Sequence, residues 1–204
     1  MIWMCIEIKK YKQAHNYDFS NYFDSSQIDD DAEALLNDFL SNPNYNLKLD
    51  KRKVPIIELA KIMGFKIYTA KFKDRNLSGT IGISEKLVNR YKSDKVIILN
   101  NQDTDEHILF TLCHELAHYI YDYESNAHNE YSNTYRTNEA INAKEMRANR
   151  FAASLLMPKE SFKEAYSELS NNIDDKNIIV QGLSDAFNAP KTAVRIRMKE
   201  VLNV

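Results

Sequence analysis

The segment His114-Glu115-Leu116-Ala117-His118 has the residue types and spacing of a zinc-dependent hydrolase site. In a helix, two histidines four residues apart project from one face and can bind the same zinc ion. Glu115 lies about a quarter of a turn away and can activate a water molecule as a general base. We therefore predict one zinc ion per chain, with His114 and His118 as ligands and Glu115 as the catalytic base.

The helix that carries these residues has the pattern of a buried element. It is predicted to begin near Asp103 or Thr104, either of which can cap it, and to continue through Tyr121. Four residues share a narrow polar stripe along this helix: His107, Thr111, His114 and His118. Apolar residues cover most of the remaining circumference, so the helix should be buried with its polar stripe facing a cleft. We expect Thr111 to support the ligands, and we interpret His107 as a supporting or surface histidine.

A third protein ligand is required, because a catalytic zinc ion keeps one coordination position for water. Glu124 does not fit the metzincin pattern, in which its position is a histidine. Glu145 is the better candidate, since it lies within the apolar face of a second predicted helix, 138–156, where a buried carboxylate needs a cation. Asn149, one turn further along, can hydrogen-bond the second nitrogen of a ligating histidine. The alternative is that Glu145 forms an exposed salt bridge, which would follow if the predicted helix phase were wrong by one residue.

The segment 122–138 between the two helices is polar and aromatic and lacks helical periodicity, which predicts a loop. Three of its residues can donate a hydrogen bond to a developing oxyanion: His128, Tyr131 and Tyr135. A loop without a catalytic role is the alternative interpretation.

The elements before the zinc-binding helix predict a small sheet. A short helix over 54–64 precedes three strand-like runs at 65–72, 77–83 and 95–100. The predicted fold is α+β, with an antiparallel three-stranded sheet packed against a zincin-type helix and a second ligand-bearing helix. The middle run contains Ser78, Gly79 and Thr80, and we interpret it as an exposed edge on which an extended substrate can add as a further strand. The alternative is that its glycines only mark a bend or a bulge.

The two ends of the chain differ from this central part. Residues 1–53 are rich in Asn, Asp, Ser and Tyr and are interpreted as a loosely attached polar arm with a short strand and a short helix. Residues 54–160 form the predicted peptidase domain. Residues 161–204 are predicted to be helical and to end in a helix-turn-helix-like pair whose second helix carries four basic residues: Lys191, Arg195, Arg197 and Lys199. DNA binding, substrate docking and simple packing all remain open for this pair.

Composition excludes several classes of protein. The 204 residues carry a formal net charge of -2, with 44% hydrophobic and 27% charged residues, which is typical of a globular protein and gives no overall basic surface for nucleic acid. Direct binding to nucleic acid is therefore not expected. Cys5 and Cys113 are too few for a disulfide framework and are interpreted as free thiols. No segment approaches the length of a membrane span, and we expect a cytoplasmic protein.

Two runs together resemble a known family. The run FTLCHELAHYI, followed by EMRANRFAASLLMP, which begins at Glu145 and ends at Pro158, is similar to the paired signature of the ImmA/IrrE metallo-endopeptidases. The segment from Val54 to Asn100 resembles the helix and strands that precede the active-site helix in that family. The resemblance implies a gluzincin-like site with His114, His118 and Glu145 as zinc ligands and Glu115 as the base.

The resemblance also implies a function. Members of this family typically cleave a helix-turn-helix transcriptional repressor and so relieve repression in a prophage, a mobile element or a stress operon. The expected partner is therefore a protein substrate of this kind. The alternative is a zinc-containing protein that binds a partner, or acts in a toxin-antitoxin pair, without proteolysis.

Overall fold

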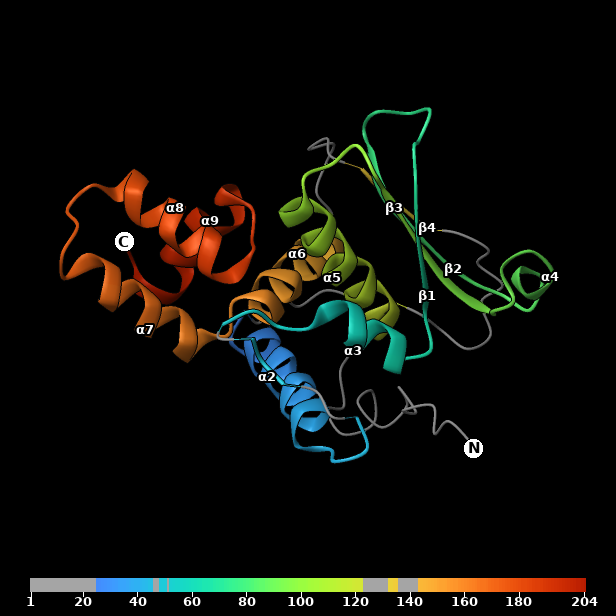
Figure 1. The fold of residues 1–204 in the computed structure, drawn as a ribbon, viewed down its shortest axis with the longest axis horizontal. Helices are drawn as coiled ribbons and strands as arrows, with labels where there is room; N and C mark the ends of the chain where they lie inside the picture. Colours follow the sequence, from blue (N-terminus) through green and yellow to red (C-terminus); the bar gives the residue numbers. More distant parts are fainter. Residues whose placement is uncertain (1–24, 46–47, 51, 123–131, 136–142) are drawn as a thin grey trace.

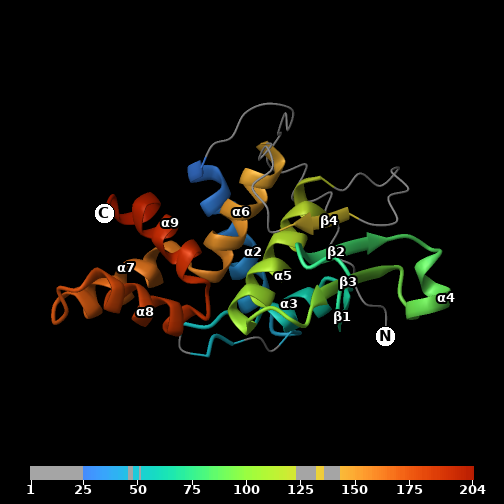
Figure 2. The same cartoon turned by 90° about the horizontal axis from the view of Figure 1, so that it is seen from above.

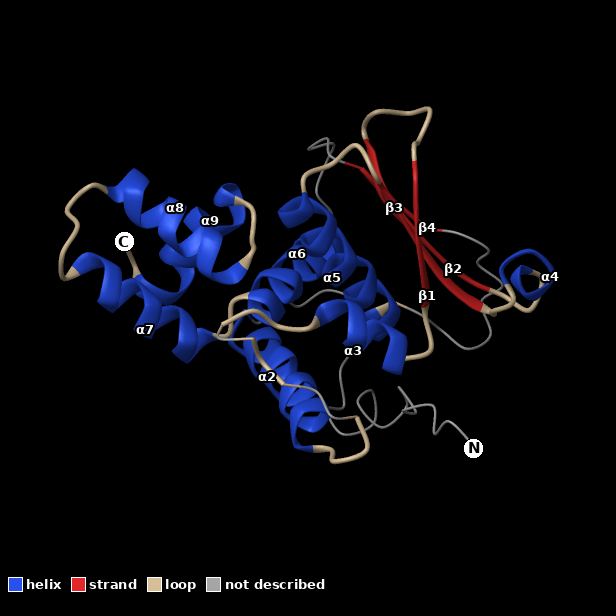
Figure 3. Ribbon diagram, in the orientation of Figure 1, coloured by secondary structure: helices blue, strands red, loops and turns tan. Residues whose placement is uncertain are grey.

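The computed structural model of the chain describes residues 25–45, 48–50, 52–122, 132–135 and 143–204. Over these residues the fold is α+β, with a group of helices on one side and a sheet on the other (Figures 1 and 3). The described helices are α2 (Ser25–Ser41), α3 (Ile56–Ile62), α4 (Leu87–Tyr91), α5 (Asp105–Tyr121), α6 (Ala143–Leu156), α7 (Lys159–Ser170), α8 (Lys176–Phe187) and α9 (Lys191–Leu202). The described strands are β1 (Lys66–Ala70), β2 (Leu77–Ile83), β3 (Lys95–Asn100) and β4 (Ser132–Tyr135).

The four strands form one mixed sheet in the order β1-β3-β2-β4. Strand β2 pairs antiparallel with β3 on one side and with β4 on the other, whereas β1 pairs parallel with β3. The prediction of a three-stranded antiparallel sheet was therefore wrong in two respects. The first is β4, a four-residue strand that lies inside the segment predicted to be a loop.

The second respect is the direction of β1. Strand β2 is paired on both sides, by β3 and by β4, so β1 joins the free side of β3. The chain between β1 and β3 is long enough for the crossover that a parallel pair needs. Alternating hydrophobicity reports which residues are buried, but it does not report which strands are neighbours.

Helix α5 is central to the described fold. It packs against β2 and β3 and against α6, so that it lies between the sheet and the second ligand-bearing helix (Figure 2). Thr104 caps the helix as predicted, because its Oγ1 accepts a hydrogen bond from the His107 backbone N–H at 3.4 Å. All residues from Thr111 to Tyr119 are buried, Cys113 included as a free thiol. The helix is thus held on several sides, which fixes the directions of its side chains.

Helix α2 is an integral part of the core, so the prediction of a loosely attached arm was wrong for this described part of residues 1–53. Five of its apolar residues are buried at helical spacing: Ile28, Ala32, Leu35, Leu36 and Phe39. This face packs mainly against α6. The predicted strand over residues 1–10 lies outside the described residues.

A buried group of charges connects α2 with α6 and α9. The carboxylate of Asp29 accepts hydrogen bonds from Arg150 and from Arg197, each at 2.8 Å, and a third from the Ser154 hydroxyl. Burial alone would raise the pKa of Asp29, but the charge of Arg197, the hydrogen bond from Ser154 and the charge of Arg150 together lower it. Ionised groups inside a protein are tolerated when they are paired in this way.

The last three helices agree with the sequence analysis in position. Helix α8 ends at Phe187, Asn188 adopts the left-handed conformation with φ of 51°, and α9 begins after Pro190. Arg197, one of the four basic residues predicted on this helix, is fully buried, and its guanidinium donates to the carbonyl oxygen of Met157 at 3.1 Å. Among the described helices, none is both long and apolar enough to cross a bilayer.

Candidate metal centre

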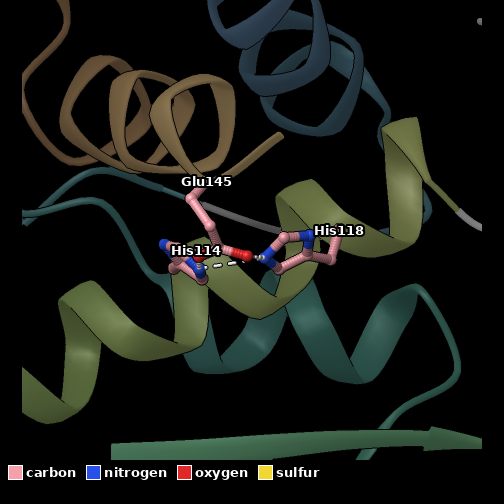
Figure 4. A group of neighbouring side chains, drawn as sticks. All are labelled: His114, His118 and Glu145. Atoms are coloured by element: carbon pink, nitrogen blue, oxygen red, sulfur yellow. Dashed lines mark hydrogen bonds and ion pairs between the residues drawn. The ribbon is translucent and has the colours of Figure 1, made fainter. Parts of the chain in front are cut away.

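Three potential metal ligands from two helices meet at one point. His114 and His118 project from α5, and Glu145 reaches them from α6 (Figure 4). The Nε2 atoms of the two histidines are 3.0 Å apart. The Glu145 carboxylate oxygens lie 3.2 Å from Nε2 of His114 and 3.3 Å from Nε2 of His118. The structure therefore brings together the three residues that the sequence analysis selected as ligands.

These distances fit a tetrahedral metal ion. Ligands at about 2.0–2.1 Å from a tetrahedral zinc ion lie roughly 3.3 Å from one another, which is close to all three separations. The two histidines are buried, whereas the side chain of Glu145 is 38% exposed. Of the three ligands, the carboxylate is therefore the one that solvent reaches.

The second nitrogen of each histidine is held by an acceptor. The Nδ1–H of His114 donates to Oδ1 of Asn149 at 2.9 Å, and the Nδ1–H of His118 donates to Oδ2 of Asp122 at 2.8 Å. These bonds fix the tautomer in which Nε2 carries a free lone pair directed at the metal position. The contact predicted for Asn149 is present in the structure.

Asp122 is a site residue that the sequence analysis missed. It follows α5 directly and lies four residues after His118, so the same helical spacing that identified the two histidines could have found it. Its other oxygen accepts a hydrogen bond from Arg147 of α6 at 2.7 Å.

Negative charge dominates the surroundings of the two histidines. Burial lowers the pKa of His118, but hydrogen bonds to Asp122 and Glu145, together with the charges of Glu145 and Glu115, raise it to about 9. Hydrogen bonds from His114 and His118 lower the pKa of Glu145, against the effect of burial. Such a centre stabilises a positive charge between the ligands, whether a proton or a metal ion.

Glu115 is fully buried beneath β2. A Cβ atom at Gly79 would lie 3.1 Å from Oε1 of Glu115 and 2.6 Å from Cγ2 of Thr111. Gly79 therefore permits a close approach of α5 to the sheet, and the shift in register between Leu77 and Gly79 in the β2–β4 pairing agrees with the alternative that this glycine marks a bulge. Thr111, which was expected to support the ligands, has its methyl group directed at Gly79 of the sheet.

The prediction that residues 77–83 form an exposed edge strand was wrong. Thr80 pairs with Ile98 of β3 and with Asn133 of β4, so β2 lies inside the sheet, and both Ser78 and Thr80 are buried. The hydrogen-bonding groups that a substrate strand would need are already used within the sheet. The four residues of β4 are too short a run to be found by alternation of hydrophobicity.

The three candidate oxyanion donors remain predictions. His128 and Tyr131 lie outside the described residues. Tyr135 belongs to β4, where its backbone pairs with Leu77, and its side chain lies outside the described part of the structure.

His107 supports the start of α5 and is not a ligand. Its Nε2 is 3.1 Å from the Ser78 hydroxyl and 3.7 Å from Oδ2 of Asp103, and burial lowers its pKa. Ser78 and Asp103 both face the same ring nitrogen, so this group lacks the relay geometry of a catalytic triad, in which each ring nitrogen has one partner. His107 also borders a pocket of about 630 Å³ between the start of α5 and the α8–α9 turn.

Comparison with family models identifies the domain. A model described as an IrrE N-terminal-like domain, of the M78 peptidases, matches residues 60–199. The chain belongs to this family. The resemblance to ImmA/IrrE peptidases is thus confirmed, and the His-His-Glu group lies within the matched M78 domain.

Comparison with solved structures supports the fold. A Mycobacterium tuberculosis transcriptional regulator matches with a TM-score of 0.52 and 16% sequence identity, over 95% of this chain and 50% of that one. The M78 chain thus spans about half the length of that structure, and at this identity the match shows a shared fold alone. A comparison with curated proteins found no match.

Proposed function

We propose that this M78 domain is a zinc-dependent endopeptidase of the cytoplasm that cleaves a helix-turn-helix transcriptional repressor. The observation that carries the proposal is the convergence of His114, His118 and Glu145 within 4.8 Å of one another, with Glu115 next to them on α5. Two neutral histidine nitrogens and one carboxylate are a common ligand set of zinc peptidases.

The residues of the chain have separate tasks in this reaction. When bound, zinc supplies Lewis-acid chemistry for peptide hydrolysis. Glu115 accepts a proton from the attacking water and delivers it to the leaving amine nitrogen. Its burial keeps bulk water away from this carboxylate. Asn149 and Asp122 hold the two histidine rings in the ligating tautomer.

The substrate class rests on the family. The resemblance to ImmA/IrrE peptidases, with membership of the M78 family, supports a helix-turn-helix repressor as the substrate. The runner-up is a non-proteolytic partner-binding protein. A buried carboxylate beside the metal ligands favours the peptidase, because binding alone gives no role to a base at this position.

Metal content of the purified protein is the first test. We expect about one zinc ion per chain in the wild type and a clear loss in Glu145→Ala, measured by elemental mass spectrometry. Glu160→Ala is the matched control, since this glutamate is exposed on α7 and forms an ion pair with Lys163. Absence of metal from the wild type after zinc is supplied would contradict the proposal.

Cleavage is the second part of the same test. Purified helix-turn-helix repressors from the source genome are incubated with the zinc-loaded wild type and with Glu115→Gln, and the products are followed by mass spectrometry. We expect a specific cut with the wild type, and none with the variant despite an unchanged zinc content. If Glu115→Gln keeps the full biological effect of the wild type, the non-proteolytic alternative is correct.

A further inference from the structure

We propose that Arg147 is a positioning residue of the metal centre, which acts through Asp122 to fix the ring of His118. The proposal rests on the proposed function only in that the centre binds zinc. It concerns metal affinity and ring orientation, so it does not depend on the identity of the substrate.

The contacts form a continuous series from α6 to the ligand. Arg147 donates from Nη2 to Oδ1 of Asp122 at 2.7 Å, and the other carboxylate oxygen accepts the Nδ1–H of His118 at 2.8 Å. Each oxygen of Asp122 is thus used by a different partner. The guanidinium of Arg147 fixes the orientation of the Asp122 carboxylate, and this carboxylate fixes the orientation of the His118 imidazole.

The position of Asp122 at the C-terminal end of α5 makes a nearby cation favourable. Asp122 is the C-terminal capping residue of α5, and its backbone N–H donates to the carbonyl oxygen of His118. The C-terminal end of a helix carries a partial negative charge that disfavours a carboxylate. A fixed positive charge beside Asp122 offsets this effect and keeps the side chain turned toward His118.

Arg147 is itself held in place. Its guanidinium lies over the ring of Tyr121, with 4.8 Å between the central carbon and the ring centroid. The Tyr121 hydroxyl donates to Oδ2 of Asp31 at 2.8 Å, and its ring packs edge-on against Phe151. The Arg147 side chain is only 11% exposed. An arginine fixed on an aromatic ring loses little further freedom when it makes a hydrogen bond.

Lys144 provides a comparison on the same carboxylate. Its Nζ is 3.5 Å from Oδ1 of Asp122, and its side chain is 63% exposed. It carries the same charge as Arg147, but it lies farther from the oxygen and is exposed to solvent. Removal of the charge of Arg147 or of Lys144 therefore distinguishes two effects on Asp122. Only Arg147 orients the carboxylate, whereas both residues attract it electrostatically.

The consequence is that α6 controls both histidines of α5. Asn149 holds His114 directly, whereas Arg147 holds His118 through Asp122, and the same helix supplies Glu145 as the third ligand. A displacement of α6 would change all three ligands together.

The zinc dissociation constant of the full chain tests the proposal. We expect Arg147→Met to bind zinc about 10-fold more weakly than the wild type in competition with a chelator, because partners behind a ligand typically change affinity 10–100-fold. Lys144→Met should change the constant by less than about 2-fold, since its contact is longer and exposed. Arg147→Lys, which keeps the charge, should lie between Arg147→Met and the wild type.

A second readout does not require zinc or activity. In the metal-free protein, the Nδ1–H of His118 should give a slowly exchanging imidazole resonance in the wild type and in Lys144→Met, and this resonance should be lost in Arg147→Met. Wild-type affinity together with a retained resonance in Arg147→Met would overturn the proposal. If Arg147→Met fails to fold, as judged by circular dichroism, Arg147→Gln is measured in its place.

These readouts also distinguish the proposal from the proposed function. A wild type that binds zinc but cleaves no repressor would contradict the function, while the zinc constants of the variants would still decide the role of Arg147. A wild type that binds no zinc would contradict the metal assignment, and the His118 resonance would then decide whether Arg147 orients the ring.

Discussion

At the scale of single residues, the closeness of β2 to α5 depends on the absence of a side chain at Gly79. The methyl group of Thr111 and the Oε1 atom of Glu115 occupy the space into which a Cβ atom would project. Glycine at this position lets the sheet lie directly against the helix that carries the ligands and the base.

Gly79→Ala should therefore destabilise the protein. A Cβ atom 2.6 Å from Cγ2 of Thr111 must push that side chain or the strand away, which typically costs about 1–3 kcal/mol in a packed interior. The free energy of unfolding in urea measures the effect. Thr111→Ser removes the methyl group concerned, so Gly79→Ala should cost less in that background. An equal cost in both backgrounds would show that Thr111 is not the obstacle.

At the scale of elements, α2 is fixed to the core by apolar packing and by one buried carboxylate. Three consecutive aspartates on this helix lie in different surroundings: Asp29 is buried between Arg150 and Arg197, Asp30 is exposed, and Asp31 accepts the Tyr121 hydroxyl. The same residue type thus serves as a buried ion-pair partner, a solvated side chain and a link to α5 within one turn.

Asp29→Asn should lower the free energy of unfolding by about 3–5 kcal/mol at pH 7, because it leaves the buried Arg197 with a neutral partner and removes one of the two acidic partners of Arg150, the other being Glu200. Asp30→Asn is the matched control and should have little effect. Denaturant unfolding monitored by circular dichroism gives both values. A loss in Asp29→Asn no larger than that of Asp30→Asn would contradict this account of α2.

The same variant predicts a change in pH dependence. The pKa of Asp29 is lowered in the folded chain, so its contribution to stability is present above the ordinary value of 3.8 and is lost as the pH falls through the lower folded value. The stability of Asp29→Asn should therefore fall less steeply below pH 4 than that of the wild type.

At the scale of the whole molecule, helix α9 is joined to the central helices by buried contacts. Arg197 bonds Asp29 of α2 and the carbonyl oxygen of Met157, and Val194 and Met198 are buried beside it. Three basic residues on α9 remain exposed: Lys191, Arg195 and Lys199. Packing against the core explains the apolar side of α9 without a nucleic acid.

Duplex DNA should accordingly bind weakly. With a net charge of -2 and Arg197 turned inward, we expect a dissociation constant no lower than about 10⁻⁶–10⁻⁴ M at physiological salt, as in non-specific binding. Fluorescence anisotropy with a labelled duplex, repeated over a range of salt concentrations, measures it. Binding in the nanomolar range that is lost in Lys191→Glu/Arg195→Glu would show that α9 recognises DNA.

The sequence alone determined the local part of the site. His114, Glu115 and His118 follow from the geometry of one helix, and Glu145 and Asn149 follow from the apolar face of another. The bounds of β2 and β3 also agree with their predicted ranges, because a hydrophobic period within a short segment needs no information from the rest of the chain.

Only the tertiary structure decided which distant segments meet. The place of β2 inside the sheet depends on β4, and the charge pairs of Asp29 join residues 121 and 168 positions apart. A buried aspartate and an exposed one look alike in the run Asp29-Asp30-Asp31, because burial depends on what packs against the helix. The link from Arg147 through Asp122 to His118 likewise exists only because α5 and α6 are packed side by side. The hydrophobic periodicity of a segment indicates which side chains share a face of its helix or strand. Which elements then pack together depends on how the whole chain buries its apolar surface away from water.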